Sequence, residues 1–287
     1  MSLAMSAIIW GLMAPIGKTV LVTGFSAVSL ASLRMIGAAV CFWITSLFVK
    51  QEKVAPHDYL LMFFAAMFGI MLNQGAYTFG LSMTSPIDAS IIVTVLPVIT
   101  MVLAALFLKE PITWMKATGV FLGLSGALLL ILSGSGSLAG GNIWGNLLCL
   151  LAASSFACYL TIFRNLIGRY SVFTLMKWMF LFSAISFLPV AYSSLAADFS
   201  QVYPASVWLG VGYVVFFGTY VAYIFMLYGQ KKLRPTVVSM YNYVQPVVST
   251  LVSVALGLAA FGMVKGFAAV LIFVAVYLVT KSKGRKE

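Results

Sequence analysis

The chain has 287 residues, of which 62% are hydrophobic and 8% are charged, and its mean hydropathy is +1.07. A soluble domain of this length does not need so much apolar surface, so the composition excludes that class and indicates a polytopic membrane protein. The formal net charge of +11 would suggest a nucleic-acid partner, but the placement of the charges argues against one.

Ten apolar stretches come close to the roughly 20 residues that a helix needs to cross the hydrocarbon core of a bilayer. We expect all ten to be helices, because an open strand edge in lipid leaves backbone groups unpaired. The first stretch lacks the basic start of a signal peptide, so we expect it to be retained. The expected fold is an all-α integral membrane protein with ten transmembrane helices. In chain order these are Leu3–Leu21, Ala27–Val49, Tyr59–Leu81, Ile87–Leu108, Trp114–Leu132, Ile143–Phe163, Val172–Tyr192, Val207–Tyr228, Val237–Leu258 and Phe261–Val279.

The chain contains a weak internal repeat. Residues 80–116 align without a gap on residues 229–265, and each half holds five of the apolar stretches. An odd number of crossings makes the second copy enter the membrane from the opposite side, which is the inverted-repeat plan of secondary transporters. We therefore expect two inverted five-helix repeats, 1–133 and 142–287, joined by a Gly/Ser linker at 134–141. The identical pairs are Gly80 with Gly229, Pro86 with Pro235, Ser90 with Ser239, Val95 with Val244, Pro97 with Pro246, Val98 with Val247 and Lys116 with Lys265.

The basic residues gather on one side of this expected topology. With the N-terminus in the cytoplasm, inner connections carry most of them, whereas the outer side keeps only Lys18 and Lys265. This asymmetry predicts that both termini are cytoplasmic, in an inner or plasma membrane. We expect the inner charges to face anionic lipid. They are Lys50, Lys53, Lys109, Lys116, Arg164, Arg169, Lys231, Lys232, Arg234, Lys281, Lys283, Arg285 and Lys286.

Prolines and glycines mark special positions in the helices. Pro97 and Pro246 lie at equivalent mid-helix positions of the two halves, where each removes a backbone hydrogen bond and is expected to act as a hinge. Gly119 and Gly123 form a GxxxG step that allows close helix approach. That step fits packing within a monomer and the face of a homodimer equally well.

Asp88 follows Ser85 and Pro86 in a capping-box arrangement at the start of the fourth stretch. It is the carboxylate that the sequence places nearest to a membrane span. Two interpretations remain open, a helix cap at the outer membrane edge and a group that couples transport to protons.

Polar and aromatic side chains within the apolar stretches predict a central site for a small molecule. Such groups are costly in lipid and usually face a bundle interior or a cavity. Interhelical hydrogen bonding without a ligand is the alternative. Aromatic walls are expected from Trp10, Tyr77, Tyr159 and Tyr223, amide donors and acceptors from Asn73, Gln74, Asn242 and Gln245, and hydroxyls from Ser90 and Thr94. Tyr241, which shares a helix face with Gln245, is a further candidate.

Arg34 lies about two turns into the second stretch and has two open roles. It could bind helix carbonyls as a structural strut, or it could attract a substrate carboxylate. Because the site lacks a cluster of basic residues, it should suit a small zwitterion or a neutral polar metabolite better than a multiply charged solute.

Catalytic constellations are absent from the sequence. It has one histidine, His57, and no cysteine–histidine cluster with metal-ligand spacing. No pair of carboxylates suited to acid–base work lies at membrane depth. We therefore expect neither an enzyme nor a cofactor, and the chain encodes no nucleotide-binding part that could drive transport. The expected partners are a small-molecule substrate and membrane lipid, and no nucleic acid.

Several segments together resemble the drug/metabolite transporter superfamily, specifically its EamA-type ten-helix transporters. They are AIIWGLMAPIGK, LASLRMIGAAV, the helix four–five block ASIIVTVLPVITMVLAALFLKEPITWMKATGVFLGLSGALLLI and the second-copy segment SMYNYVQPVVSTLVSVALGLAAFGMVKGFAAVLI. The family pattern usually has glycine where Lys109 stands, and Ala259 stands where the second copy should have the counterpart of Glu110.

The resemblance implies alternating access around a central cavity and export of amino acids, other metabolites or drugs. It carries Trp10 and Arg34 over as candidate cavity residues. A flippase for lipid-linked carriers, which uses a related helix architecture, is the alternative function. A membrane scaffold without transport would tolerate loss of the polar residues.

Overall fold

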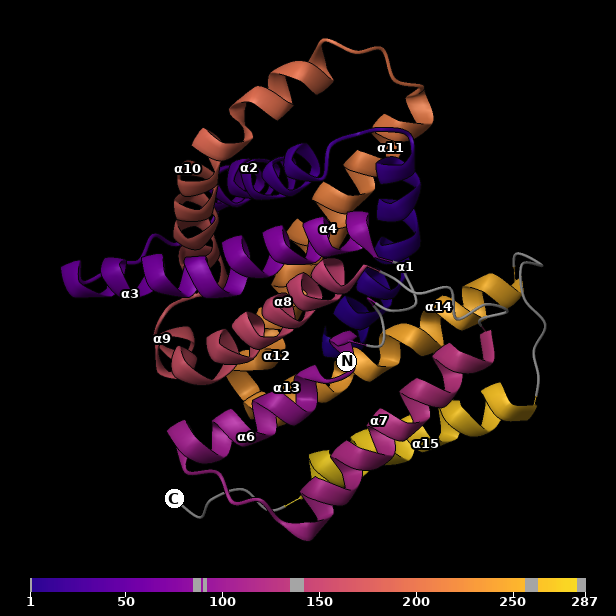
Figure 1. Ribbon diagram of the computed structural model, residues 1–287. Coiled ribbons are helices and arrows are strands. Elements are labelled where there is room, and N and C mark those ends of the chain that lie inside the picture. The colour runs from indigo at the N-terminus through magenta and orange to yellow at the C-terminus, as the bar shows by residue number, and fades with distance from the viewer. Residues whose placement is uncertain (1, 85–88, 90–91, 135–141, 256–262, 283–287) are drawn as a thin grey trace.

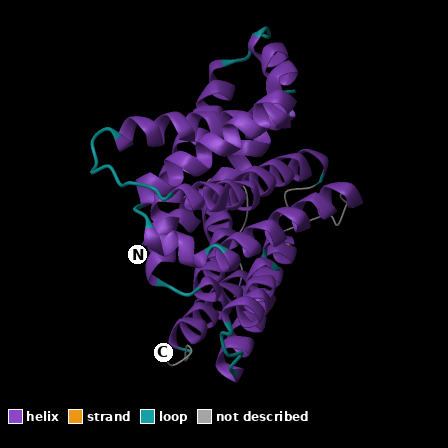
Figure 2. Cartoon of the chain, turned by 90° about the vertical axis from the view of Figure 1, so that its left-hand side faces the viewer, coloured by secondary structure: helices purple, strands orange, loops and turns teal. Residues whose placement is uncertain are grey.

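The computed structural model describes residues 2–84, 89, 92–134, 142–255 and 263–282. Every regular element in these ranges is a helix (Figure 2). The elements η1 and η2 are π-helical turns and η3 is a 3-10 turn. In chain order the elements are α1 Ser2–Val22, α2 Ala27–Ser46, α3 Pro56–Ala66, η1 Met67–Leu72, α4 Asn73–Met83, α6 Leu96–Leu108, α7 Trp114–Gly134, α8 Ile143–Ile162, α9 Arg164–Arg169, α10 Val172–Phe199, α11 Ala205–Val215, η2 Phe216–Val221, α12 Ala222–Lys232, α13 Pro235–Met240, η3 Tyr241–Tyr243, α14 Val244–Ala255 and α15 Met263–Lys281.

The described part of the chain holds six helical stretches that are long and apolar enough to cross a membrane. They are Ser2–Val22, Ala27–Ser46, Pro56–Met83, Ile143–Ile162, Val172–Phe199 and Ala205–Lys232. Shorter apolar helices accompany them at Leu96–Leu108, Trp114–Leu129 and Gly266–Lys281. The protein is therefore an all-helical, multi-pass membrane protein, whereas the full set of ten crossings stays a prediction. One expected end is wrong, because α10 continues past Tyr192 to Phe199 through a segment that includes the strong helix formers Leu195, Ala196 and Ala197.

Two long helices contain a π-helical turn at matching places, a feature that the sequence analysis missed. The series α3, η1 and α4 and the series α11, η2 and α12 have equal lengths, and each boundary of the second lies 149 residues after its counterpart. Wide turns of this kind are rare and concentrate at functional sites. Each of the two contains a glycine, Gly69 and Gly218.

The helices that carry Pro97 and Pro246 are broken before the prolines rather than loosened at them. A turn at residues 94–95 precedes α6, in which Pro97 is the second residue. In the other half, η3 precedes α14, in which Pro246 is the third residue. Proline is well suited to the start of a helix, where its missing N–H would have no intrahelical partner. The expected hinges therefore lie at the junctions of two helical segments.

The glycine step on α7 packs within the chain, against α15 (Figure 1). A Cβ added to Gly119 would lie 2.6 Å from Cγ2 of Val279, and one added to Gly123 would lie 2.5 Å from the ring of Tyr243. This close approach accounts for the small residues. The observed contacts show that this face packs within the chain.

A network of hydrogen bonds joins several connections at one end of the bundle. We call it the basic end, because Arg164 and Arg169 lie there. The carboxylate of Asp58, in the first turn of α3, accepts hydrogen bonds from Arg169 at 2.8 Å and from the hydroxyl of Tyr170 at 2.6 Å. The bond to Asp58 raises the pKa of Tyr170 above its usual value. Arg164 donates to the carbonyl of Leu233 at 2.8 Å. These contacts join connections of the two halves.

Two expectations about charged residues are wrong at this end. Lys116 does not face lipid headgroups, because its ammonium is buried in an ion pair with Glu110 at 2.9 Å. Thr236 at the start of α13 also donates to this carboxylate, at 3.3 Å. In addition, Asp58 is a buried carboxylate in the first turn of a long apolar helix. The sequence analysis had instead expected Asp88 to be the carboxylate nearest to a membrane span. Asp88 itself lies outside the described residues.

Candidate functional site

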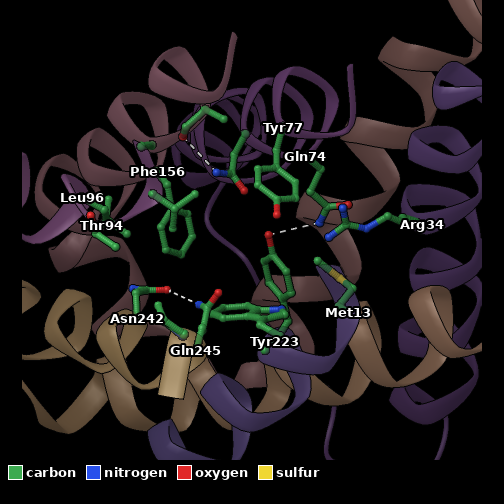
Figure 3. Close-up of a pocket in the computed structure, with 17 residues that line it drawn as sticks. Met13, Arg34, Gln74, Tyr77, Thr94, Leu96, Phe156, Tyr223, Asn242 and Gln245 are labelled. Atoms are coloured by element: carbon green, nitrogen blue, oxygen red, sulfur yellow. Dashed lines mark hydrogen bonds between the residues drawn. The ribbon is translucent and has the colours of Figure 1, made fainter. Parts of the chain in front are cut away.

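A cavity of about 120 Å³ lies where α1, α2, α4, α8, α12 and α14 converge (Figure 3). This is room for several water molecules. Nine side chains that the sequence singled out line it, and they come from both halves of the chain. They are Trp10, Arg34, Asn73, Gln74, Tyr77, Thr94, Tyr223, Asn242 and Gln245.

Two of the predicted site residues, Tyr241 and Tyr159, do not line this cavity, and a third is not described. Ser90 lies outside the described residues. Tyr241 lines a second, smaller cavity of about 10 Å³. Tyr159 is fully buried behind the wall, with its ring against Gly69 and its hydroxyl donating to Gln230 at 3.3 Å.

Apolar lining residues were missed by the sequence analysis, notably Phe156 on α8 and Met13 on α1. Phe156 lies one turn before Tyr159 on α8 and takes the wall position that was expected of Tyr159. An apolar side chain in an apolar stretch carries no signal of its own. The helical periodicity that relates Met13 to Trp10 was the available sign.

The two π-helical turns hold aromatic side chains of the site. The carbonyl of Gly218 in η2 accepts a hydrogen bond from the indole of Trp10 at 2.9 Å, and the carbonyl of Gly69 in η1 accepts one from the hydroxyl of Tyr223 at 3.2 Å. Gly69 also makes room for a neighbouring ring, since a Cβ there would lie 2.6 Å from the ring of Tyr159. The turns therefore fix the orientation of two cavity walls.

The amide side chains form three kinds of contact. Gln74 donates to the hydroxyl of Tyr223 at 3.1 Å, a bond between residues 149 positions apart. Asn73 donates to the carbonyl of Ala152 at 2.9 Å and so joins α4 to α8. Gln245 donates to Asn242 at 2.7 Å, which orders the wall at η3 and α14. Asn73 and Gln74 thus make interhelical bonds of the kind that the alternative interpretation requires, and all four amide residues line the cavity.

Arg34 is 4% exposed and enters the cavity from α2. Its Nε donates to the hydroxyl of Thr219 at 3.1 Å and its Nη1 to the hydroxyl of Thr78 at 3.5 Å. These partners are side-chain hydroxyls rather than the helix carbonyls expected of a strut. Within the described ranges, no group of three or more His, Cys, Asp or Glu side chains could hold a metal ion.

Comparison with known proteins places the chain in a family. The model of the EamA-like transporter family matches residues 1–132 and 143–281. The chain belongs to this family. The uncharacterized inner membrane transporter YedA of Escherichia coli K12 is 29% identical over 266 residues, which cover 88% of this chain and 81% of that protein. An uncharacterized transporter of Archaeoglobus fulgidus is 27% identical over 252 residues, which cover 87% and 86% of the two chains.

A crystal structure also shares the EamA-like fold. It superposes with a TM-score of 0.75 at 18% identity, covering 97% of this chain and 94% of the other. At this identity the likeness shows the fold alone. The family and these relatives together show that the protein is a membrane transporter.

Proposed function

We propose that the protein is a secondary-type transporter that exports amino acids or other small metabolites or drugs by alternating access at the central cavity. The observation that carries this proposal is the cavity itself, which polar and aromatic side chains of both halves line. Sites of secondary transporters lie at the interface of two repeats. The direct bond between Gln74 and Tyr223 supports such an interface here. Equivalent residues of two repeats can touch only near the axis that relates the repeats.

The proposal includes ten crossings in two inverted repeats, 1–133 and 142–287. The offset of 149 between the π-helical turns supports a repeat of this size. Positive charge at the basic end, together with the positive-inside rule, favours a cytoplasmic position for that end and for both termini, in an inner or plasma membrane.

Alternating access requires a barrier that opens on one side at a time. Trp10, Phe156 and Asn242 line both the main cavity and the smaller one, so they separate the two. The smaller cavity also touches Leu3, whose side chain packs against Gly229 close to the basic end. We propose that these three side chains form the barrier toward the cytoplasm and that the junctions before Pro97 and Pro246 supply the movement.

Counterflow in proteoliposomes tests the proposed function. Purified protein would be offered amino acids and small metabolites, beside the Asn73→Leu/Gln245→Leu double variant, which removes two polar contacts of the cavity. The matched control is Gln201→Leu, because Gln201 is an exposed amide between α10 and α11 that does not line the cavity. Uptake of one solute class by the wild type and the control, lost in the double variant, is the expected result.

Two outcomes would contradict the proposal. Equal uptake by the double variant would move the site away from the cavity. A folded protein that exchanges no soluble solute but retains a co-purifying lipid with a long acyl tail would favour the flippase.

A further inference from the structure

Arg34 is a buried cation at the cavity wall without a described counter-ion. Its side chain is 4% exposed on α2, a helix that is long and apolar enough to cross a membrane. In the described part of the chain no Asp or Glu oxygen lies within 4.0 Å of it, since the three ion pairs found there involve His57, Lys116 and Arg169. Cations at such a depth are costly unless they are paired, and they mark functional sites.

Two threonine hydroxyls position the guanidinium. The hydroxyl of Thr219 donates to the carbonyl of Val214 at 2.9 Å, and that of Thr78 donates to the carbonyl of Gln74 at 2.7 Å. Because each hydroxyl spends its only proton in this way, its lone pairs are left to accept from Arg34. Neutral hydroxyls orient the charge without cancelling it.

The remaining N–H groups of Arg34 are available to a ligand. A guanidinium has five donors in a rigid plane, and the threonines use two of them. Figure 3 shows the side chain reaching toward the amide of Gln74 and the hydroxyl of Tyr223. In the described residues the Oε1 atom of Gln74 is buried without a hydrogen-bond partner. Arg34 therefore has unused N–H donors at this wall, and the Oε1 atom of Gln74 beside it is an unused acceptor.

The chemistry of the rest of the cavity limits the ligand. No other Lys or Arg occurs among the described lining residues, so the site can balance one negative charge. The rest of the wall includes apolar and aromatic side chains, among them Met13, Trp10 and Phe156. A guanidinium matches a carboxylate in bidentate geometry.

We propose that Arg34 is the carboxylate-binding subsite of the cavity, so that the transported solute carries a single carboxylate on a small, partly apolar body. This inference deepens the proposed function and rests on it. The threonines Thr78 and Thr219 act as positioning residues for Arg34.

The test compares acids with their primary amides, which keep the shape and lose the charge. The probes are propionate, benzoate and indole-3-acetate, each beside its amide, and the measured quantity is the dissociation constant from ligand-induced thermal stabilisation of the full chain in detergent. For at least one pair the wild type should prefer the acid by about tenfold or more, the range expected for a charge-assisted hydrogen bond. Arg34→Gln should abolish this preference, and Arg34→Lys should retain part of it.

Arg164→Gln is the matched control, because Arg164 binds the carbonyl of Leu233 and does not line the cavity. It should keep the acid preference, whereas Thr219→Val should weaken it without abolishing it. If Arg34→Gln does not fold, the reduced preference of Arg34→Lys and Thr219→Val decides the question. No acid preference in the wild type, or an undiminished preference without Arg34, overturns the inference.

Counterflow with the same pairs separates the inference from the function on which it rests. Exchange of amides and acids at equal rates would leave a transporter without an acid-selective site. Acid-selective binding without exchange of any probe would support the subsite and count against transport.

Discussion

The buried ion pair between Lys116 and Glu110 allows one stability prediction to be worked out in full. Lys116 lies in the first turn of α7, where a positive charge is unfavourable beside the helix dipole. The ion pair with Glu110 compensates for this unfavourable position. The side chains are 1% and 8% exposed, and the carboxylate also accepts from Thr236. Removing one member of a buried pair leaves the other charge buried without a partner and lowers the free energy of unfolding by about 3–5 kcal/mol. Replacing both members with neutral groups of similar size can change the stability little.

We therefore expect Lys116→Met to lower the free energy of unfolding by about 3–5 kcal/mol. In a chain of this size that corresponds to a fall in Tm on the order of 10 °C. The double variant Lys116→Met/Glu110→Gln should recover most of the loss. The assay is thermal unfolding of purified protein at one fixed scan rate, because membrane proteins of this kind unfold irreversibly. A double variant as unstable as Lys116→Met alone would refute the reasoning.

Three further variants test separate features. Lys109 has a left-handed backbone with φ of 54° at the end of α6, a conformation that glycine adopts at lower cost. Lys109→Gly should therefore stabilise the protein by about 1 kcal/mol. An unchanged or lower Tm would count against this explanation. Gly80→Ala would place a Cβ 2.6 Å from the sulfur of Cys149 and 2.8 Å from the carbonyl of Gly145, so α4 and α8 must separate and Tm should fall by several degrees. Its control is Gly212→Ala, which has nothing within 4 Å and should change Tm little. Trp10→Phe keeps an aromatic ring and removes the bond to Gly218, so transport should weaken several-fold, and full activity would show that the bond does not position the wall.

The sequence predicted the class of fold and most of the polar lining, because both depend on patterns with strong physical causes. Apolar stretches of membrane length identify helices, and polar groups inside them point away from lipid. Gln74 and Gln245 could be assigned to a cavity on that basis, and the structure brings both to it.

Other features had no comparable signal. The π-helical turns depend on how Gly69 and Gly218 meet side chains from distant helices, which a local pattern does not encode. Tyr159 and Phe156 are both aromatic and one turn apart, so only packing decides which of them faces the cavity. Lys109 is the instructive case, because the family's glycine at that position was already a sign of a left-handed backbone.

The uncompensated charge of Arg34 also bears on the driving force. In a cell whose interior is negative, moving one elementary charge across the membrane is worth about 2.3 kcal/mol per 100 mV. A solute that leaves the cell with one net negative charge, after binding to this guanidinium, moves down the electrical gradient. At 100 mV the membrane potential alone could sustain an outward concentration ratio of about fifty-fold, since each 1.36 kcal/mol is a factor of ten. For such an anion, voltage alone would drive export, and transport rates measured at different clamped potentials would reveal it.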